Sequence, residues 1–429
     1  MDLKGKVLLL MGGGAYAKGI KKYKEEKGFG IVTLGKDKDT PISRIADKFY
    51  NIDTQNVDAV VEVVKKENID GIFVGSSEVN INPAIDVAAR TGIHFYVNRE
   101  QWDIISNKAQ FKHIAREFGF PVIPEYHLSQ NPTDEEIDAL QFPVMIKPTD
   151  SSGARGMNPC YRKEDFRHYY NEALQWSKKK EVIVEKLITN AKEVFVNYTI
   201  QDGEATLAYS FTKILIKTED EQVMVPLFHM YPSNYINEYC DHVDASAKRM
   251  ITGMGLKDGT LTLQGFYKEG KFFFFEAGYR MGGAQAYILT DYINGANVLE
   301  YMINYALTGS MNDTPISQIE NVHFRYPCCN YYVALKPGRI EKVDGLNEVE
   351  EMRGVLNITP MCKVGDLIEN TNALERVAYR IHVLGNDADD LAKTLVNISQ
   401  TLRIYNNKGE EMQLEPLTYE RCMQAIMEK

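Results

Sequence analysis

The stretch LTLQGFYKEGKFFFFEAGYR, residues 261–280, has the pattern of a β-hairpin with polar groups on one face. Two apolar strands flank the dipeptide Glu269-Gly270, which predicts a tight turn. Gln264 and Glu276 can then point to the same face and offer oxygen atoms to one divalent cation. Arg280 follows where the chain leaves the strand, so the set can hold Mg²⁺ and a transferring phosphoryl group. The alternative is a surface cross-strand pair with a salt-bridging arginine.

A second stretch, KPTDSSGARGM at residues 147–157, follows the apolar run FPVMIK. Lys147 ends that run, so its ammonium group should emerge at the end of a strand. The loop is either a surface hairpin or a mobile lid over phosphates. The following NPCYRKEDF offers no clear alternating partner strand, which favours the lid. Lys108 opens a predicted helix, where a bare lysine is unfavourable for the helix dipole unless an anion binds nearby.

Residues 1 to about 100 alternate strand and helix, which predicts right-handed βαβ units around a parallel sheet. The predicted strands include KVLLLM, FGIVTLG, GIFVG and IHFYV. The glycines of MGGG, residues 11–14, do not form G-x-G-x-x-G. They indicate either a tight turn or an anion site made by free N–H groups.

Beyond residue 106 the sequence changes to mixed α and β segments. Residues 193–280 are predicted to be mostly β, with hairpins at Asp202-Gly203 and Glu269-Gly270. One helix is predicted through AYILTDYINGANVLEYMINYALTG. From about residue 313 a small α+β domain with one closing helix is expected. The fold class is therefore α/β and α+β.

The composition excludes several classes of protein. The net charge is −10 and the basic residues are not clustered along the chain, which argues against a nucleic-acid partner. No apolar run is long enough to span a bilayer, and the first residues lack a secretory signal pattern, so no membrane partner and a cytoplasmic location are expected. The six cysteines show no paired spacing, which favours unpaired thiols over a disulfide or zinc site.

The motifs, taken in order, resemble the ATP-grasp superfamily. They are Asn107-Lys108, GFPVIP, FPVMIKPTDSSGARGM, VIVEKL, Glu193 and the Q(x11)E(x3)R pattern of the first hairpin. The resemblance implies an N-terminal Rossmann-like domain at 1–105, a two-lobed ATP-grasp domain at 106–312 with a lid subdomain at about 115–188, and a C-terminal α+β domain at 313–429. It also implies ATP and Mg²⁺ or Mn²⁺ as cofactors.

The resemblance assigns roles residue by residue. Lys108 and Lys147 would contact ATP phosphates, and the lid would be Ser151, Ser152, Gly153, Arg155, Gly156 and Met157. The adenine would lie against Glu185, Lys186, Leu187 and Ile188, with Glu185 on the exocyclic amine and Glu193 on the ribose. Gln264 and Glu276 would bind the metal, and Arg280 would stabilise the phosphoryl group. Weaker substrate candidates are Glu78, His229, Gly282 and Gly283; Glu78 is equally well read as a helix N-terminal acid.

The activity implied is that of a ligase, in which a carboxylate becomes an acyl phosphate and is attacked by an amine. Small-molecule substrates and a homodimer are expected. Two positions depart from the usual pattern: Gln264 stands where glutamate is common, and Gly278 stands where asparagine is common. They leave two alternatives open: a carboxylase or formate-using relative, and a non-catalytic nucleotide-binding protein.

Overall fold

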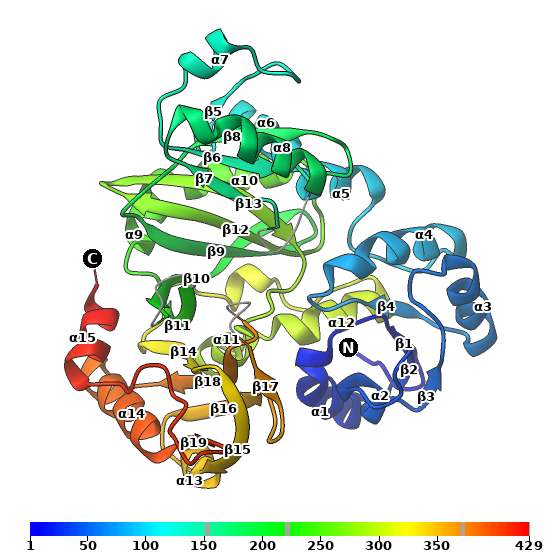
Figure 1. Cartoon of the computed structure of the whole chain (residues 1–429). Helices are drawn as coiled ribbons and strands as arrows, with labels where there is room; N and C mark the ends of the chain where they lie inside the picture. Colours follow the sequence, from blue (N-terminus) through cyan, green and yellow to red (C-terminus); the bar gives the residue numbers. More distant parts are fainter. Residues whose placement is uncertain (151–154, 219–223, 370–373, 429) are drawn as a thin grey trace.

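The computed structural model describes residues 1–150, 155–218, 224–369 and 374–428 (Figure 1). Its strands form a four-stranded parallel sheet, a second four-stranded sheet, an eight-stranded antiparallel sheet and a three-stranded sheet. The mixed α/β architecture confirms the predicted fold class.

The parallel sheet occupies the first hundred residues and has the order β3-β2-β1-β4. Its elements are β1 (Val7–Leu10), η1 (Gly14–Tyr16), α1 (Ala17–Lys27), β2 (Gly30–Leu34), α2 (Pro41–Ile45), β3 (Lys48–Tyr50), α3 (Val57–Glu67), β4 (Gly71–Phe73), η2 (Glu78–Asn80), α4 (Ile81–Thr91) and α5 (Arg99–Ser106). The predicted βαβ alternation is confirmed. The predicted strand IHFYV is wrong, because the segment makes only a single bridge between His94 and Gly71.

The second sheet, ordered β5-β8-β6-β7, lies at the top of Figure 1. This part comprises α6 (Lys108–Glu117), β5 (Glu125–Tyr126), α7 (Asp134–Asp138), β6 (Val144–Pro148), β7 (Asn158–Cys160), η3 (Lys163–Asp165), α8 (Phe166–Trp176) and β8 (Val182–Lys186). Strands β6 and β7 pair antiparallel, with Val144 opposite Cys160. The argument that NPCYRKEDF has no partner strand is therefore wrong: the loop after Lys147 joins two paired strands.

The eight-stranded sheet has the order β13-β12-β9-β10-β11-β14-β18-β16. Its elements and the helices between them are β9 (Lys192–Gln201), β10 (Glu204–Lys217), β11 (Met224–Tyr231), α9 (Ile236–His242), α10 (Asp244–Gly253), β12 (Gly259–Lys268), β13 (Lys271–Tyr279), α11 (Tyr287–Asn294), α12 (Val298–Thr308), η4 (Ile316–Gln318), β14 (Cys328–Ala334), β16 (Val355–Pro360) and β18 (Val377–Leu384). Both predicted hairpins are confirmed. Two helices replace β structure at 236–253, and two helices replace the single one predicted after residue 286.

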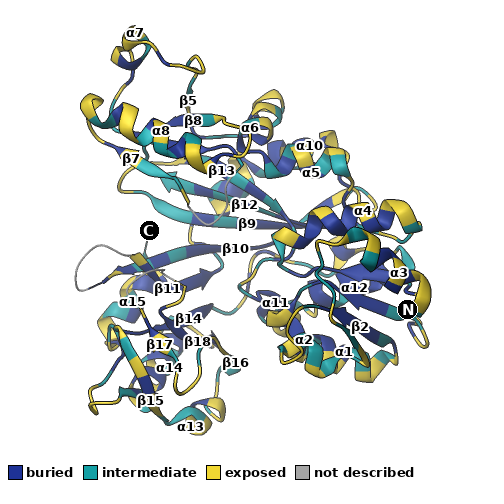
Figure 2. Cartoon of the chain, turned by 45° about the vertical axis from the view of Figure 1, so that its right-hand side comes forward, coloured by how far each residue is buried: buried dark blue, intermediate teal, exposed yellow. Residues whose placement is uncertain are grey.

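The C-terminal part contributes three strands to this large sheet. It adds β15 (Gly338–Asp344), α13 (Leu346–Glu350), β17 (Leu367–Ile368), α14 (Ala388–Thr401), β19 (Arg403–Asn406) and α15 (Tyr419–Met427), with a small sheet ordered β17-β15-β19. The predicted closing helix forms as α14, but α15 follows it, so the expectation of one closing helix is wrong. Figure 2 shows the strands of the large sheet mostly buried and the peripheral helix α7 exposed.

The largest apolar core joins the N-terminal sheet to the middle of the chain. It contains residues of β1, α1, β9, β12 and α12 together. Gly71 of β4 lies so close to α12 that a Cβ there would come within 2.0 Å of the Ala306 carbonyl oxygen. Glycine is required at this position because the two backbones touch. The N-terminal sheet is thereby fixed against the large one.

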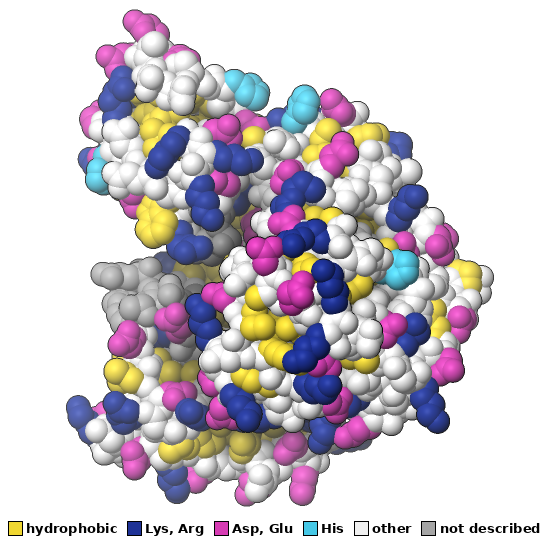
Figure 3. All heavy atoms as spheres, turned by 90° about the vertical axis from the view of Figure 1, so that its right-hand side faces the viewer, with side chains coloured by type: hydrophobic (Ala, Val, Ile, Leu, Met, Phe, Trp, Pro, Cys, Tyr) yellow, Lys and Arg dark blue, Asp and Glu magenta, His cyan; other side chains and the backbone are white. Residues whose placement is uncertain are grey.

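No helix within the described ranges is long and apolar enough to cross a lipid bilayer. On the face shown in Figure 3, basic and acidic side chains are interspersed.

Candidate active site

Gln264 and Glu276 are direct cross-strand partners in β12 and β13, so both side chains lie on one face of the sheet. The Gln264 Nε2 group donates to Glu193 Oε1 at 2.6 Å. Because a carboxylate only accepts, the amide must turn its NH₂ toward Glu193, and its Oε1 points away from that contact. The pair therefore offers one carboxylate and one amide oxygen on the predicted shared face, which a register shift between Gln264 and Gly265 produces. The role of the pair toward a metal stays a prediction.

Lys108 stands at the first position of α6, and the Asn107 side chain caps the helix by accepting from the N–H groups of Ala109 and Gln110. Its Nζ lies 3.8 Å from Glu276 Oε1, and its side chain is buried while that of Glu276 is 42% exposed. A predicted phosphate contact and a predicted metal ligand thus meet at one point. The buried ammonium and the helix N-terminus both favour an anion, and the Glu276 carboxylate lies within ion-pair distance of them.

Lys147 does not emerge into solvent, contrary to prediction. It is 4% exposed, with Nζ 2.6 Å from Glu185 Oε2 and 4.9 Å from the centre of the Phe275 ring. Lys112, which the sequence analysis did not single out, binds the other Glu185 oxygen and also pairs with Glu125. Burial opposes ionisation, but Lys147 and Lys112 outweigh it and hold the pKa of Glu185 below its usual value.

The predicted adenine segment follows this buried ion cluster. The Lys186 N–H donates to the Pro124 carbonyl at 3.0 Å, and the Leu187 N–H donates to the Pro143 carbonyl at 3.2 Å. These bonds fix the end of β8 before Ile188. The roles given to Glu185, Lys186, Leu187 and Ile188 toward adenine stay predictions.

Of the predicted lid, Ser151, Ser152 and Gly153 lie outside the described residues. Arg155 is exposed, and Met157 precedes β7. Gly156 has φ +70°, and a Cβ there would meet the Trp176 side chain at 2.6 Å. Glycine at 156 therefore allows both the left-handed backbone and the packing of the indole.

Glu193 sits between two partners on the face that carries Gln264. Its carboxylate accepts from Gln264 and pairs with Lys213 Nζ at 3.1 Å. Lys213 was also not singled out from the sequence; its register opposite Glu193 in β10 brings the two together.

Arg280 joins the end of β13 to the N-terminal sheet. It pairs with Glu78 Oε2 at 3.3 Å and donates to the Met281 carbonyl at 3.1 Å. Glu78 begins η2, just after β4. Arg280 was predicted to stabilise the phosphoryl group and Glu78 was a candidate substrate contact, and the structure brings the two together across 202 positions of the chain.

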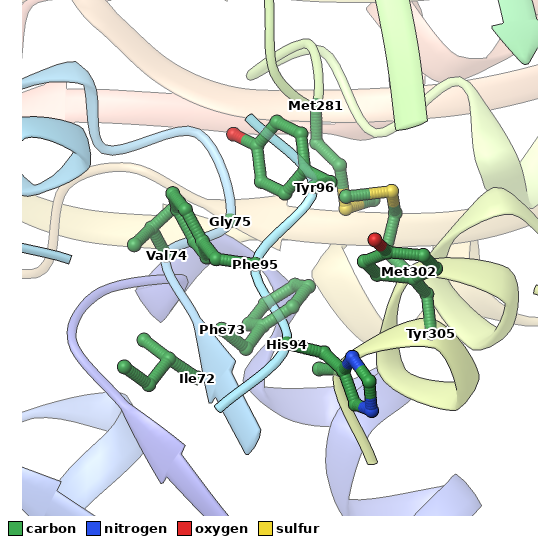
Figure 4. A pocket seen from close by; sticks show the side chains of 11 residues that line it. Ile72, Phe73, Val74, Gly75, His94, Phe95, Tyr96, Met281, Met302 and Tyr305 are labelled. Carbon is green, nitrogen blue, oxygen red and sulfur yellow. The ribbon is translucent and has the colours of Figure 1, made fainter. Parts of the chain in front are cut away.

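Met281 anchors the segment after Arg280. It is buried against a cavity of about 10 Å³ whose apolar lining includes Tyr96, Met302 and Tyr305 (Figure 4). A cavity of this size holds at most one water molecule, so it is a packing feature rather than a ligand site. The packing fixes the chain on the C-terminal side of the Arg280 guanidinium.

The predicted substrate glycines lie next in the chain. The Gly282 carbonyl accepts from the Tyr16 hydroxyl at 2.6 Å, and the Gly283 carbonyl accepts from Arg380. Both glycines are therefore held by side chains from other parts of the molecule.

His229 is buried in β11 and stacks on Phe211 with ring centres 4.4 Å apart. Burial, with help from Lys213 and Arg380, lowers the pKa of His229 well below its usual value, so the ring is neutral near pH 7. Its Nδ1 lies 3.1 Å from the Tyr332 hydroxyl. His229 also lines a large cavity of about 1180 Å³.

Within the described part of the chain, no group of three or more His, Cys, Asp or Glu side chains could hold a metal ion. Every cysteine is a free thiol, as the sequence predicted. Any cation at Gln264 and Glu276 would therefore need further oxygen ligands from a bound molecule or from water.

Residues 107–313 match the family described as carbamoyl-phosphate synthase L chain, ATP binding domain. A formate-dependent phosphoribosylglycinamide formyltransferase from Sulfurisphaera tokodaii is 23% identical over 258 residues, which are 58% of this chain and 64% of the relative. The chain thus spans less than two thirds of that relative.

Several solved structures share the fold over nearly the whole chain. The L-amino acid ligase from Bacillus licheniformis gives a TM-score of 0.76 at 14% identity, covering 95% of this chain and 100% of that one. The biotin carboxylase domain dimer of Hydrogenobacter thermophilus 2-oxoglutarate carboxylase, solved with MgADP and bicarbonate, gives 0.76 at 16% identity, covering 95% and 91%. Residues 107–313, which are 207 of the 429 residues, thus match an ATP-binding domain of the carbamoyl-phosphate synthase type, and the chain shares the fold of these two solved structures.

Proposed function

We propose that the protein is an ATP-dependent ligase that activates a carboxylate as an acyl phosphate and joins it to an amine, releasing ADP and phosphate. The observation that carries the proposal is the meeting of Lys108 with Glu276, directly opposite Gln264 and four residues before Arg280. A buried cation and two oxygen ligands at the β13 edge of the large sheet, with an arginine just after that strand, are groups that phosphoryl transfer requires.

Gln264 and Glu276 fit Mg²⁺ or Mn²⁺ held chiefly by nucleotide. A magnesium ion in such sites takes one or two protein oxygens and completes its octahedron with phosphate oxygens and water. The partial exposure of Glu276 leaves room for those ligands. The ion would neutralise charge that develops on the transferring phosphoryl group. The MgADP named with the structurally similar biotin carboxylase domain supports this cofactor pair.

The chain's own residues would orient the reaction. Lys108 and Lys147 would bind phosphate oxygens, which requires Lys147 to exchange part of its pairing with Glu185 for the nucleotide. A carboxylate oxygen of the substrate attacks the γ-phosphorus, and the bond to the ADP oxygen breaks. Arg280 would stabilise the acyl phosphate while the amine nitrogen attacks the acyl carbon, phosphate leaves and the nitrogen loses a proton.

The segments around this centre complete the proposal. Residues 185–188 would bind adenine, Glu193 the ribose, and the loop at 151–157 would close over the phosphates. The expected homodimer is supported by the dimer named for the biotin carboxylase domain, and sedimentation velocity of the purified chain would test it.

The experiment is ADP release from the purified chain with ATP and Mg²⁺ in the presence of amino acids, other carboxylates with amines, bicarbonate or formate. A ligase releases ADP only when a carboxylate and an amine are both present, and mass spectrometry then finds the joined product. Arg280→Lys is compared with the wild type in the same assay. ADP release that responds to bicarbonate alone would overturn the ligase assignment.

A second candidate is a formate- or bicarbonate-using enzyme. It is supported by the formate named for the Sulfurisphaera tokodaii relative and the bicarbonate named for the biotin carboxylase structure. The same assay separates the two, because formate or bicarbonate would then replace the larger carboxylate. Binding of ATP without turnover of any pair would indicate instead a non-catalytic nucleotide-binding protein.

A further inference from the structure

Lys112, in the middle of α6, is a fully buried lysine to which the proposed chemistry gives no role. Its ammonium group donates to Glu185 Oε1 and lies 2.5 Å from Glu125 Oε1. The two glutamates are directly opposite each other in β5 and β8, where like charges repel. Lys112 lies against both carboxylates and offsets this repulsion.

Lys112 belongs to a chain of ion pairs in which the signs alternate. The chain runs from Lys147 in β6 through Glu185, Lys112 and Glu125 to Arg116, one turn further along α6. The strands and the helix that carry it lie together at the top of Figure 1. Arg116, whose side chain is 38% exposed, ends the chain at the surface, and Lys147 ends it at the residue expected to bind phosphate. Each carboxylate thus has a cation on either side.

The two cations of Glu185 are held in different ways. Lys112 makes a hydrogen bond to Oε1, whereas Lys147 lies 2.6 Å from Oε2 as an ion pair without hydrogen-bond geometry. Burial opposes ionisation of Glu185, but the two lysines together outweigh it and lower the pKa of this carboxyl. With Lys112 in place, the carboxylate keeps a counter-charge even when Lys147 turns to another anion.

Helix α6 connects this ion chain to the proposed metal ligands. Lys108 and Lys112 are four residues apart and therefore lie on one face of the helix. Lys108 Nζ is 3.8 Å from Glu276 Oε1, and Lys112 binds Glu185, the first residue of the segment expected to hold adenine. The same face of α6 therefore meets the proposed metal site at one turn and the proposed adenine segment at the next.

We propose that Lys112 is a positioning residue for nucleotide binding: it balances the charge of Glu185 while Lys147 leaves that carboxylate and binds the phosphates of ATP. The proposal rests on the ATP-dependent function proposed above and deepens it, because it names the group that permits the exchange of Lys147. Without Lys112, the buried Glu185 carboxylate would face Glu125 with Lys147 as its one cation. Moving Lys147 to phosphate would then leave a buried charge unpaired, which is strongly unfavourable.

The test is calorimetric titration of the full chain with a non-hydrolysable ATP analogue and Mg²⁺. For Lys112→Met at about pH 8, we expect Kd at least about tenfold above that of the wild type, because Lys147 stays with Glu185. Lys112→Arg keeps the charge and should remain within about threefold of the wild type. If Lys112→Met does not fold, Lys112→Gln, which keeps a hydrogen-bond donor without the charge, should show the same loss of affinity.

The pH dependence separates this role from a general loss of stability. In Lys112→Met, burial and the facing Glu125 both oppose ionisation of Glu185, so its pKa should rise and the carboxyl should take up a proton as the pH falls. Lys147 is then released from Glu185. The ratio of the variant Kd to the wild-type Kd should therefore approach one between about pH 8 and pH 6, and this ratio cancels the protonation of the nucleotide itself.

A double-mutant cycle tests whether Lys112 acts through Glu185. Glu185→Gln removes the charge that holds Lys147, so adding Lys112→Met in that background should change Kd by less than about threefold. A tenfold loss in both backgrounds would show that Lys112 acts independently of Glu185 and would overturn the proposal.

The matched control is Arg116→Met. Arg116 belongs to the same helix and the same chain of ion pairs, but it pairs with Glu125 instead of Glu185. Its loss should lower the melting temperature and leave Kd within about twofold of the wild type at both pH values. If Lys112→Met matches Arg116→Met in affinity at about pH 8, the proposal is overturned.

The titration measures binding alone, so it separates this proposal from the ligase function. A wild type that binds the analogue but releases no ADP with any substrate pair contradicts the ligase function and not the role of Lys112. Equal affinity of the wild type and Lys112→Met, with ADP release retained, contradicts the role of Lys112 alone. A wild type that binds no analogue contradicts both.

Discussion

Arg280 connects the end of β13 to the N-terminal sheet, because it pairs with Glu78. The next residue, Met281, packs against a small apolar cavity. Arg280→Lys retains a charge but loses the planar fork that can bind two oxygens at once. We expect kcat for ADP release to fall by roughly 10²–10³-fold, the range seen when one preorganised donor is removed from a transition state.

The control for that variant is Arg90→Lys, which alters an arginine paired with Asp58 at 2.7 Å far along the chain from the site. It should retain the wild-type kcat. Affinity for a non-hydrolysable ATP analogue should change little in Arg280→Lys, since the residue is expected to act on the transferred group. An unchanged kcat in Arg280→Lys would remove the residue from the mechanism.

Glu320 is a buried carboxyl that the proposed chemistry does not use. Thr199 Oγ1 donates to its Oε1 at 2.8 Å, and burial raises its pKa to about 8. Between its unfolded value and pH 8 the native state therefore binds one more proton than the unfolded chain. Its contribution to stability is fully present at low pH and is lost as the pH rises through this window.

Glu320→Gln should remove this dependence. Between about pH 5.5 and 7.5, the free energy of unfolding of the wild type should fall by up to about 1.4 kcal/mol per pH unit more steeply than that of the variant. Urea unfolding at fixed ionic strength measures both slopes, and the exposed Glu204→Gln serves as control. Parallel slopes for wild type and Glu320→Gln would show that the carboxyl is ionised in the native state.

At the scale of elements, the β6–β7 connection combines two requirements at Gly156: a left-handed backbone and close packing against Trp176 at the end of α8. Gly270, in the β12–β13 turn, has a similar φ of +77° but nothing within 4 Å of a Cβ. Gly270→Ala should therefore cost backbone strain alone, roughly 1 kcal/mol, and Gly156→Ala should cost about 1–3 kcal/mol more.

Urea unfolding measures the two costs. Gly156→Ala should also weaken binding of an ATP analogue, because the displaced connection belongs to the proposed lid, whereas Gly270→Ala should not. Equal costs in the two variants would mean that Trp176 moves aside freely.

The elements also show where pattern reading succeeds. Both hairpins form at Asp202-Gly203 and Glu269-Gly270, whose residues adopt positive φ. These features depend on a few adjacent residues. The helices α9 and α10 were missed: neither N-cap carries a side-chain hydrogen bond, so the usual start signal is absent. The start of α5, in contrast, has the residues of a capping box, Asn98 and Gln101, which could have been recognised in the sequence.

At the scale of the whole molecule, the proposed boundary at residue 312 divides one continuous sheet. Strand β11 pairs with β14, which pairs with β18, so the C-terminal strands extend the sheet that begins with β13. A fragment of residues 1–312 would expose the edge of β11 and its buried Leu227 and Phe228. Unpaired apolar edges promote association.

We therefore expect the 1–312 fragment to aggregate or to unfold without a cooperative transition, while the full chain remains monodisperse under the same conditions. Size-exclusion chromatography with light scattering and urea unfolding test this. A monodisperse fragment that unfolds cooperatively would show that residues 313–429 are an independent folding unit.

The sequence by itself determined the alternation of strand and helix in the first hundred residues, both hairpins and the order of the motifs, because apolar periodicity and turn residues act over a few neighbouring positions. It did not fix the register of Gln264 and Glu276: the two-residue turn alone would place Gln264 opposite Phe275, and the register shift between Gln264 and Gly265 brings Glu276 opposite it. Only the tertiary structure decided that Lys147 is buried against Glu185 and Lys112, and that Arg280 meets Glu78. It alone placed Arg380 beside Gly283 and the large cavity. These pairs are brought together by sheet order and by packing between distant segments, and no local pattern of residues encodes either.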